Sequence, residues 1–441
     1  MDVRAQTSHD VEPIERETIK RVAWRLMPLL MLGYFCNFLD RVNVGMAAPT
    51  MNPDLGFSSA VYGFGAGIFF LGYFVFEIPS NLLLNRIGAR RWLAGIFVSW
   101  GIVSGLTAFV WNDWSFYGIR CLLGLAEAGF FPGAVLYMTW WFPSYYRTRM
   151  IAVFFTSIVA SLIIGPPISG LLLNMNGLLA LRGWQWLFLL EALPSLIMAV
   201  VIWQLLTDRP NDADWLSPEQ KAWLNERLAS ERAQREAVRK YSLAEAFTNR
   251  KVWLLTLAYF GHTTSQFGLT TFMPLIVKGL GVPTNMIGLV SGAPFIFALA
   301  AVLLWGRHSD RTGERKWHAA AGWATLGAGM AAGIFIGGGH PILLMIALCF
   351  AAMGTFAGPV IFWSLPSALL TGAAAAGGIA MINAAGSLGG WLGPWLFGLV
   401  KDATGSDTIA LLCLAGAAFM AAIAVVVAGP DPRMVRIPSR G

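Results

Sequence analysis

The chain has 441 residues, of which 56% are hydrophobic and only 12% are charged, with a formal net charge of +7. Soluble domains typically carry about 25% charged residues, so this composition excludes an ordinary soluble enzyme. The positive charge does not indicate a nucleic-acid partner, because the basic residues follow the connections between apolar stretches. The chain is therefore predicted to cross a lipid bilayer many times.

A polar N-terminal segment, 1–23, precedes twelve apolar stretches, each long enough for a transmembrane helix of about 20 residues. The predicted spans are 24–49, 59–84, 92–111, 115–142, 150–173, 184–206, 252–277, 284–305, 317–337, 341–364, 374–398 and 408–428. A polar linker, 207–250, separates two groups of six, and a cytoplasmic tail, 429–441, follows the last span. We predict an all-α membrane protein with six-helix bundles at 24–206 and 251–428.

Lys and Arg are unevenly distributed over the connections. Of the 31 Lys and Arg residues, 26 lie in the N-terminal segment up to Arg25, in alternate connections and in the tail. Cytoplasmic loops carry this excess, so both ends are predicted to lie in the cytoplasm. Within the linker, Ser217, Pro218 and Gln220 form a helix start with a capping box. They predict a short amphipathic helix that lies on the bundle or on the membrane surface.

Two basic connections indicate an internal repeat. The connection between the second and third spans, 85–91, and the one between the eighth and ninth, 306–316, share an Arg-x-Gly core. The two cores lie 225 residues apart, which is about half the chain. This spacing predicts two homologous halves, an architecture found among transporters.

Four ionisable residues lie inside predicted spans: Asp40 and Arg41 in the first, and Arg120 and Glu127 in the fourth. A charge at bilayer depth costs roughly 2.5–3.5 kcal/mol, and such residues usually face a water-filled path and pair with each other or with a substrate. Arg120 and Glu127 share one helix face to within about 20°, whereas Asp40 and Arg41 point about 100° apart. Two carboxylates and two guanidiniums in an apolar wall predict a site that binds an anion and carries a proton.

Each of these four residues has a predicted role. Asp40 and Glu127 are the candidates for proton coupling, because a carboxyl between apolar surroundings and an Arg can take up and release a proton as a cavity opens and closes. Arg41 is the candidate for a substrate carboxylate, which its planar fork matches. Arg120 is a second clamp or the partner of Asp40. The alternative is a permanent ion pair of Arg120 with Glu127 or Asp40 that only holds helices together.

Further polar residues in the spans are candidates to hold the substrate. They are Tyr73 on the second span, His262 and Gln266 on the seventh, Trp363 and Ser364 around the tenth, and Asn383 on the eleventh. For each, packing or hydrogen bonding between helices is the alternative. Glu77 and Glu191 are predicted to be structural groups or, for Glu77, a gating group.

Motifs for other chemistry are missing from the sequence. We find no Walker A loop, no dinucleotide fingerprint, no nucleophile elbow and no metal-ligand cluster. The chain is therefore not expected to be an enzyme, to hold a metal or to need a cofactor.

Several short motifs carry a resemblance to a known family. They lie at 38–43 (FLDRVN), 77–82 (EIPSNL), 120–133 and 306–316. Together they resemble the major facilitator superfamily and, within it, the anion:cation symporter family. The greatest similarity is to the bacterial tartrate, phthalate and 4-hydroxyphenylacetate permeases.

This resemblance implies two pseudo-symmetric halves that rock around a site at the midplane. It also implies proton-driven symport of an organic carboxylate into the cell, by a protein expected to act as a monomer. The family's proton carriers match Asp40 and Glu127, and its anion-binding residues match Arg41 and Arg120. Tartrate or a related hydroxy or sugar acid is the first expectation, and an aromatic carboxylate is the alternative. A transporter-like sensor and a channel are more remote alternatives.

The resemblance further implies a gating motif at the two basic connections. Its candidate residues are Asn85, Arg86, Gly88 and Arg90 in the first connection, and Asp310, Arg311, Gly313 and Arg315 in the second. The first connection has Asn85 where the superfamily has an Asp that helps to latch the halves in the outward-open state. The resemblance therefore shifts the expected latch to Asp310.

Overall fold

The computed structural model describes residues 13–237, 248–336, 340–369 and 372–428, and the regular elements within them are helices. The helices before the linker are α1 (Pro13–Leu55), α2 (Ser59–Ile87), α3 (Ala89–Leu106), α4 (Asp113–Glu127), α5 (Phe130–Trp141), α6 (Ser144–Leu173) and α7 (Gly183–Leu205). The linker contains α8 (Pro218–Ala237). The helices after it are α10 (Arg250–Gly279), α11 (Thr284–Thr312), α12 (Lys316–Ile336), α13 (Pro341–Phe362), α14 (Ser364–Leu369), α15 (Gly372–Thr404) and α16 (Asp407–Ala428).

Nine helical segments in the described part of the chain are long and apolar enough to cross a bilayer. The helices α10, α12 and α15 occupy the three remaining stretches that the sequence predicts as spans. The predicted all-α membrane protein is confirmed. The predicted count of twelve spans is reached only if these three helices also cross the bilayer. The limits of the N-terminal segment, the two bundles, the linker and the tail stay predictions.

The fourth predicted span is not one continuous helix. It breaks between α4 and α5, where Gly129 lies against α2 so closely that a Cβ there would come within 1.7 Å of the Ser80 hydroxyl oxygen. Pro132 follows in the first turn of α5 and cannot donate a backbone hydrogen bond to Ala128. The tenth predicted span also breaks, between α13 and α14, where Pro366 cannot donate to Phe362.

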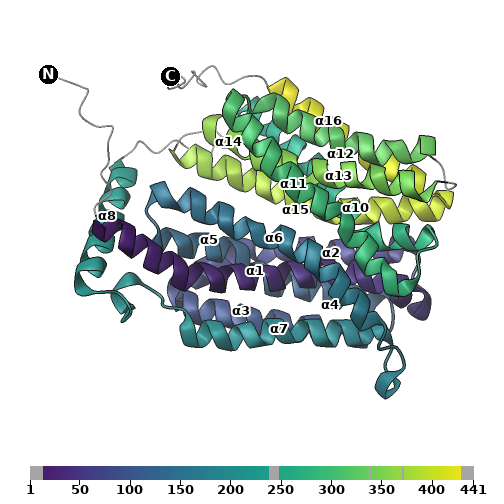
Figure 1. The fold of residues 1–441 in the computed structure, drawn as a ribbon, viewed down its shortest axis with the longest axis horizontal. Coiled ribbons are helices and arrows are strands. Elements are labelled where there is room, and N and C mark those ends of the chain that lie inside the picture. Colours follow the sequence, from purple (N-terminus) through teal and green to yellow (C-terminus); the bar gives the residue numbers. More distant parts are fainter. Residues whose placement is uncertain (1–12, 238–247, 337–339, 370–371, 429–441) are drawn as a thin grey trace.

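The helices form two layers, with α1 to α7 in one and α10 to α16 in the other (Figure 1). The layers meet where α2 packs on α15, α6 on α11 and α1 on α10. Hydrogen bonds cross between the layers near the C-terminal ends of α1 and α10: the Tyr62 hydroxyl donates to the Thr271 carbonyl at 3.0 Å, and the Lys278 amine donates to the Pro49 carbonyl. In the predicted orientation, these contacts close the periplasmic end.

The linker helix α8 packs against α1 and α5. Its predicted capping box is confirmed, because the Ser217 hydroxyl accepts from the Gln220 amide and the Gln220 side chain accepts from the Ser217 amide, both at 3.2 Å. The Glu231 carboxylate accepts from the Ser144 amide at 3.0 and 3.1 Å and so caps α6. The linker helix therefore lies on the bundle, which was one of the two predicted locations.

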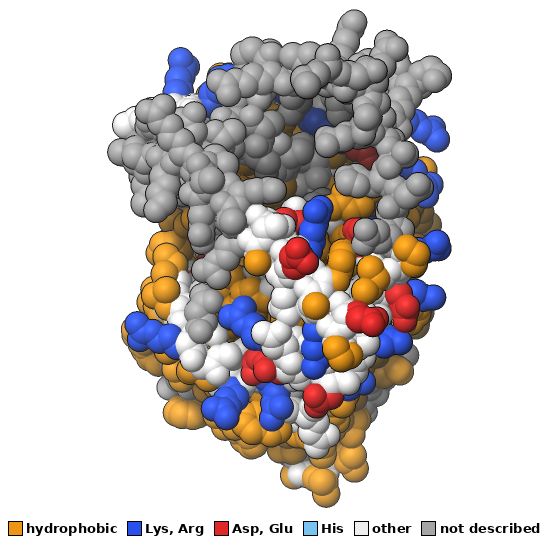
Figure 2. Space-filling view, turned by 90° about the vertical axis from the view of Figure 1, so that its left-hand side faces the viewer, with side chains coloured by type: hydrophobic (Ala, Val, Ile, Leu, Met, Phe, Trp, Pro, Cys, Tyr) orange, Lys and Arg blue, Asp and Glu red, His pale blue; other side chains and the backbone are white. Residues whose placement is uncertain are grey.

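Figure 2 shows the end of the molecule at which α8 lies, with Lys and Arg side chains spread over it and Asp and Glu among them. This is the end that the distribution of Lys and Arg predicts to be cytoplasmic.

We expect two glycine substitutions on α4 to have opposite outcomes. A Cβ on Gly124 would come within 1.9 Å of the Phe69 carbonyl oxygen on α2, whereas one on Gly118 would meet open space. Gly124→Ala should therefore push α4 away from α2 and lower the melting temperature by several degrees, and Gly118→Ala should leave it unchanged or slightly raised. Thermal unfolding of the two purified variants checks this; equal melting temperatures would contradict the packing described.

Candidate functional site

Asp40 is fully buried inside the first layer of helices. Its carboxylate accepts four hydrogen bonds: from the Trp100 indole at 2.5 Å, the Ser104 hydroxyl at 2.7 Å, the Ser195 hydroxyl at 2.9 Å and the Asn43 amide at 3.2 Å. These donors come from α3, α7 and α1, so Asp40 joins the helices behind the interface between the layers. A buried carboxylate tolerates this place because hydrogen bonds replace its lost hydration.

Arg41 and Glu127 form a buried ion pair between α1 and α4. The Arg41 Nε lies 3.0 Å from the Glu127 Oε2, which also accepts from the Asn37 amide at 2.9 Å. The Glu127 side chain is fully buried and that of Arg41 is 14% exposed. The sequence interpretation offered an ion pair of Arg120 with Glu127 or Asp40 as the alternative. In the structure, Glu127 pairs with Arg41 instead.

Aromatic rings surround the Arg41 guanidinium. Its central carbon lies 5.3 Å from the ring centroids of Phe38 and Phe69 and 5.0 Å from that of Tyr73. Tyr73, a predicted substrate ligand, therefore packs beside Arg41. Ring faces attract a cation more strongly where water is excluded, so this cage helps to hold the charge in an apolar wall.

Arg120 is the cation with the least compensation in the site. Its side chain is almost fully buried, and its Nη2 makes one long hydrogen bond, 3.5 Å, to the Ala66 carbonyl. Its Nε and Nη1 have no hydrogen-bond partner among the described residues. A buried guanidinium with unused N–H groups is suited to bind an anion, because a carboxylate can satisfy two of them at once.

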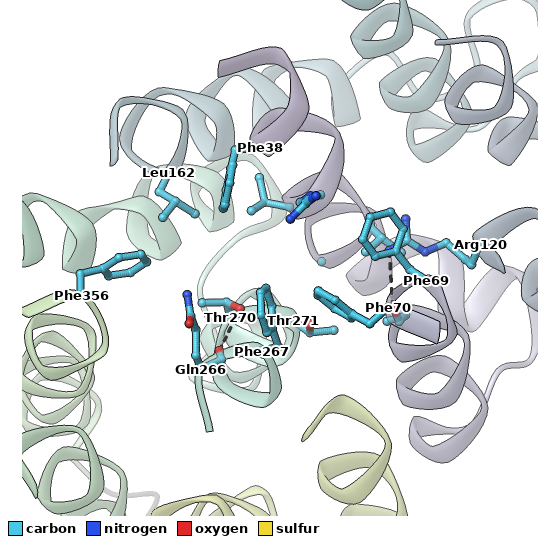
Figure 3. A pocket seen from close by; sticks show the side chains of 15 residues that line it. Phe38, Phe69, Phe70, Arg120, Leu162, Gln266, Phe267, Thr270, Thr271 and Phe356 are labelled. Carbon is cyan, nitrogen blue, oxygen red and sulfur yellow. Dashed lines mark hydrogen bonds between the residues drawn. The ribbon is translucent and has the colours of Figure 1, made fainter. Parts of the chain in front are cut away.

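A small pocket, partly open to solvent, lies between the layers beside the two arginines (Figure 3). Its first wall carries Arg41, Arg120 and aromatic side chains of α1 and α2. The facing wall comes mainly from α10 and α13. It consists of Gln266, Phe267, Thr270, Thr271 and Phe356. The pocket thus sets two cations against a wall of aromatic and neutral polar groups.

Sequence reasoning identified Gln266 but missed Thr270, Thr271 and Phe356 on the same wall. Thr270 lies four residues after Gln266, and Thr271 four after Phe267. Residues four apart share a helix face, so this spacing could have indicated the threonines. Phe356 had no such signal, because α13 is apolar on most sides.

The other predicted substrate ligands lie outside the pocket lining. His262 stacks on the Trp323 ring, with centroids 5.2 Å apart, and Trp363 packs on Tyr259 at 4.9 Å. The Ser364 hydroxyl, at the start of α14, donates to the Ile361 carbonyl at the end of α13, 2.6 Å away. In this conformation these three side chains contribute to packing, and their roles in binding stay predictions.

Asn383 joins the two layers of helices. Its amide donates to the Glu77 carboxylate at 3.0 Å, from α15 to α2. Glu191, the other carboxyl predicted to be structural, accepts from the Ser169 hydroxyl at 2.6 Å and joins α7 to α6.

The first basic connection makes a tight turn between α2 and α3. Gly88 ends α2 with a φ of 95°, which favours glycine, and the Arg90 amide donates to the Asp208 carboxylate at 2.8 Å. Arg86 is exposed, and the side chain of Asn85 lies outside the described part of the structure.

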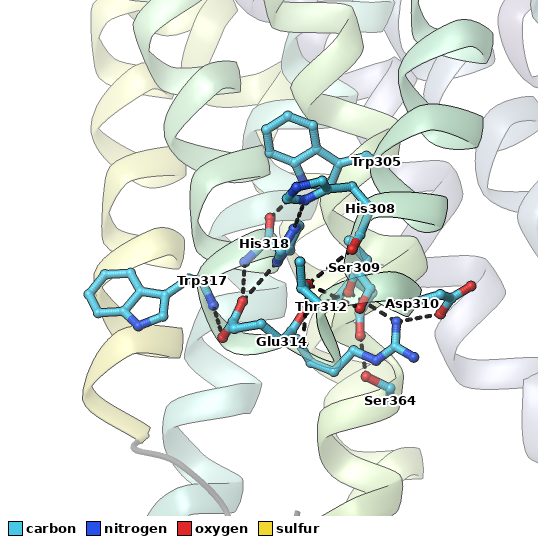
Figure 4. A network of polar contacts seen from close by, with 11 residues as sticks. Trp305, His308, Ser309, Asp310, Thr312, Glu314, Trp317, His318 and Ser364 are labelled. Atoms are coloured by element: carbon cyan, nitrogen blue, oxygen red, sulfur yellow. Dashed lines mark hydrogen bonds and ion pairs between the residues drawn. The ribbon is translucent and has the colours of Figure 1, made fainter. Parts of the chain in front are cut away.

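The second basic connection is held by its own side chains (Figure 4). Arg315 pairs with Asp310 at 2.7 Å and donates to the Ser309 hydroxyl at 3.0 Å. Gly313 ends α11 with a φ of 68°, and Arg311 is exposed. Asp310, the expected latch, is thus paired inside its own connection in this conformation.

A histidine pair lies beside this connection. The His308 Nδ1 and the His318 Nε2 are 2.6 Å apart, and the Glu314 carboxylate lies 2.8 Å from the His318 Nδ1. Partial burial raises the pKa of Glu314, but hydrogen bonds from the Trp317 amide, the His318 ring and the His318 amide outweigh it and hold the pKa below its usual value. The carboxylate therefore fixes which nitrogen of His318 faces His308.

Two layers of membrane-spanning helices around a pocket with buried charges define a membrane transporter. The family model of the Major Facilitator Superfamily matches residues 30–283 and 255–440. The chain belongs to this superfamily. The chain is therefore a transporter and not an enzyme.

Relatives and solved structures agree with this assignment. A candidate tartrate transporter of Agrobacterium vitis is 46% identical, over 96% of this chain and 94% of the relative. A quinolone resistance transporter of Acinetobacter baumannii is 40% identical, over 91% and 92%. The crystal structure of a D-xylose–proton symporter has a similar fold, with a TM-score of 0.72, 15% identity and coverage of 93% of this chain and 99% of that one.

We expect the effects of removing Arg41 and of removing Glu127 on the melting temperature not to add up, because the two side chains form an ion pair. Removing one partner leaves the other charge buried alone, which costs about 3–5 kcal/mol, whereas removing both often costs less. Glu127→Leu should therefore lower the melting temperature more than the double variant Arg41→Leu/Glu127→Leu. Unfolding of the three proteins in one detergent measures this order; a double variant less stable than Glu127→Leu would contradict it.

Proposed function

We propose that this transporter carries an organic carboxylate together with protons into the cell by alternating access. The observation that carries the proposal is the state of the two pocket arginines: Arg41 is paired with Glu127, and Arg120 has unused N–H groups. One cation is thus open to an anion, and the other is held by a group that a proton can neutralise.

Glu127 and a substrate carboxylate would compete for Arg41. The Arg41 Nε already lies 3.0 Å from the Glu127 carboxylate, so a second anion there would meet a like charge. A proton on Glu127 removes that charge and frees Arg41 to bind the anion together with Arg120. Proton uptake and anion binding would therefore favour each other, which a symporter requires.

Asp40 is proposed as a second proton carrier, coupled to the site through α1. It is adjacent to Arg41 in the chain and accepts hydrogen bonds from α3 and α7. A proton on Asp40 would displace one of its donors and loosen the contact of α1 with those helices. The change would be transmitted to Arg41 by the backbone that the two residues share.

Tartrate or a related hydroxy or sugar acid is the proposed substrate. The relative with 46% identity is named for tartrate, and Gln266, Thr270 and Thr271 offer hydrogen bonds for hydroxyl groups opposite the arginines. An aromatic carboxylate is the second candidate, because Phe38, Phe267 and Phe356 also line the pocket. We place the chain in a bacterial inner membrane, as a monomer with both termini in the cytoplasm.

Uptake into proteoliposomes tests the function. We expect one compound from a labelled panel of tartrate, galactarate, galactonate, phthalate and 4-hydroxyphenylacetate to accumulate under an inward proton gradient and to leak out on addition of a protonophore. Accumulation that is driven by exchange for an anion loaded inside the liposomes, and that does not respond to the proton gradient, would overturn proton symport. Uptake of no compound on the panel would overturn the choice of a carboxylate.

Removing the arginine fork should abolish substrate binding. Arg41→Gln keeps a polar side chain but loses the charge, so we expect at least a tenfold weaker affinity for the transported anion. Calorimetry or ligand-induced thermal shift measures this on folded protein. Unchanged affinity would exclude Arg41 from the anion site.

Neutralising Glu127 should leave substrate binding and exchange intact but remove their dependence on the proton gradient. Glu127→Gln imitates the protonated carboxyl and leaves Arg41 free, so counterflow exchange should persist while accumulation under a proton gradient is lost. Glu191→Gln is the matched control, because it replaces another buried carboxyl of the same helix layer, one that accepts from the Ser169 hydroxyl and not from a pocket arginine. Gradient-driven accumulation by Glu127→Gln would exclude Glu127 from proton coupling.

A further inference from the structure

The first turn of α2 is capped by a residue from the other layer of helices. Asp402, in the last turn of α15, accepts from the Ser59 amide at 3.0 Å through one carboxylate oxygen and from the Ala60 amide at 2.7 Å through the other. The first N–H groups of a helix have no partner inside the helix, and the positive end of the helix dipole favours a negative charge there. The carboxylate thus bridges the two halves through the backbone of α2.

The other hydrogen-bonding groups of this turn do not accept from the Ser59 and Ala60 amides. The N-cap residue Ser58 uses its hydroxyl to accept from the Val61 amide at 3.2 Å and its carbonyl to accept from the Tyr62 amide at 3.0 Å. The amides of Ser59 and Ala60 have only the Asp402 carboxylate as a partner among the described residues. Loss of Asp402 would therefore leave both amides to water.

The cap depends on the closed interface at this end. A Cβ on Gly398 would come within 2.1 Å of the Ser59 carbonyl oxygen, and one on Gly63 within 2.2 Å of the Pro394 carbonyl oxygen. The backbones of α15 and α2 are therefore in direct contact beside the cap. When the halves separate at this end, the Asp402 carboxylate must leave the end of α2.

The second crossing of the layers at this end has no such cap. There α6 packs on α11 equally closely, since a Cβ on Gly288 would come within 2.1 Å of the Pro166 carbonyl oxygen. The N-cap residue of α11, Pro283, offers no side-chain hydrogen bond. Close backbone packing thus occurs at both of these crossings, whereas a charge bridges the layers at the crossing of α2 and α15, through Asp402, and at that of α1 and α10, through Lys278.

We propose that Asp402 is a charged latch, which stabilises the conformation closed at the end of α2 and must release that helix before this end opens. The proposal needs the alternating access of a transporter, and it needs neither proton coupling nor a carboxylate substrate. Failure of the proposed substrate or of symport would therefore leave it intact.

Double electron–electron resonance on the full-length protein in lipid nanodiscs tests the latch. Spin labels are placed on cysteines that replace Trp114 and Met286, exposed residues in the first turns of α4 and α11, in a background without the native cysteines. Asp402→Asn keeps the size of the side chain and removes the charge. We expect the ratio of the long to the short distance to rise roughly two- to five-fold at neutral pH, as for loss of a charge at a helix end.

Three further variants separate a latch from a general loss of stability. Asp402→Glu keeps the charge and should restore much of the original ratio. Ser59→Pro removes one of the two amide donors at a helix position that accepts proline, so it should produce part of the shift even if Asp402→Asn fails to fold. Asp113→Asn removes an acidic residue from the first turn of α4, within one layer, and should leave the ratio unchanged. An unchanged ratio in both Asp402→Asn and Ser59→Pro, or an equal shift in Asp113→Asn, would overturn the latch.

Discussion

The ion pair of Arg41 and Glu127 is the interaction on which the site depends. Both charges lie at a depth where hydration is lost, and each is tolerated because the other is 3.0 Å away. This contact uses the Glu127 carboxylate, and the Arg120 Nε and Nη1 are left without a hydrogen-bond partner among the described residues. The same contact joins α1 to α4 and so fixes the distance between the two cations. The packing of α1 on α4 and the proposed anion binding therefore depend on the same pair of side chains.

Close contact between helix backbones makes this arrangement possible. In a membrane, lipid chains are as apolar as leucine, so helices associate by tight packing of small residues. Gly124 brings α4 onto α2 within one layer, and Gly398 brings α15 onto α2 between the layers. The first contact lies within one layer and positions Arg120, whereas the second lies at the interface that the proposed alternating access would separate. Small residues thus line both kinds of helix contact.

The sequence predicted the kinds of groups in the site better than their partners. Charges inside apolar spans singled out Asp40, Arg41, Arg120 and Glu127 as candidates, because a charge at bilayer depth is costly. Helical periodicity could not predict that Arg41 would pair with Glu127, since the rotation of α1 relative to α4 is set by packing. His262 shows the same limit: it lies four residues before Gln266 on one face, yet it stacks on Trp323 while Gln266 lines the pocket. Apolar length predicted where the helices lie, but α1 (Pro13–Leu55) extends beyond the predicted 24–49, and the break before Phe130 needed the contact of Gly129 with α2.

The unequal pairing of the two arginines suits a carrier that must return empty. If both guanidiniums were held by carboxylates, an anion would have to displace two ion pairs and would bind weakly. If both were unpaired, the empty carrier would hold two uncompensated buried charges and would pay a large desolvation cost in each return step. One arginine held by a titratable acid and one left open lies between these limits. In the proposed mechanism, the anion would begin to bind at Arg120, and a proton on Glu127 would then release Arg41 to bind the anion as well.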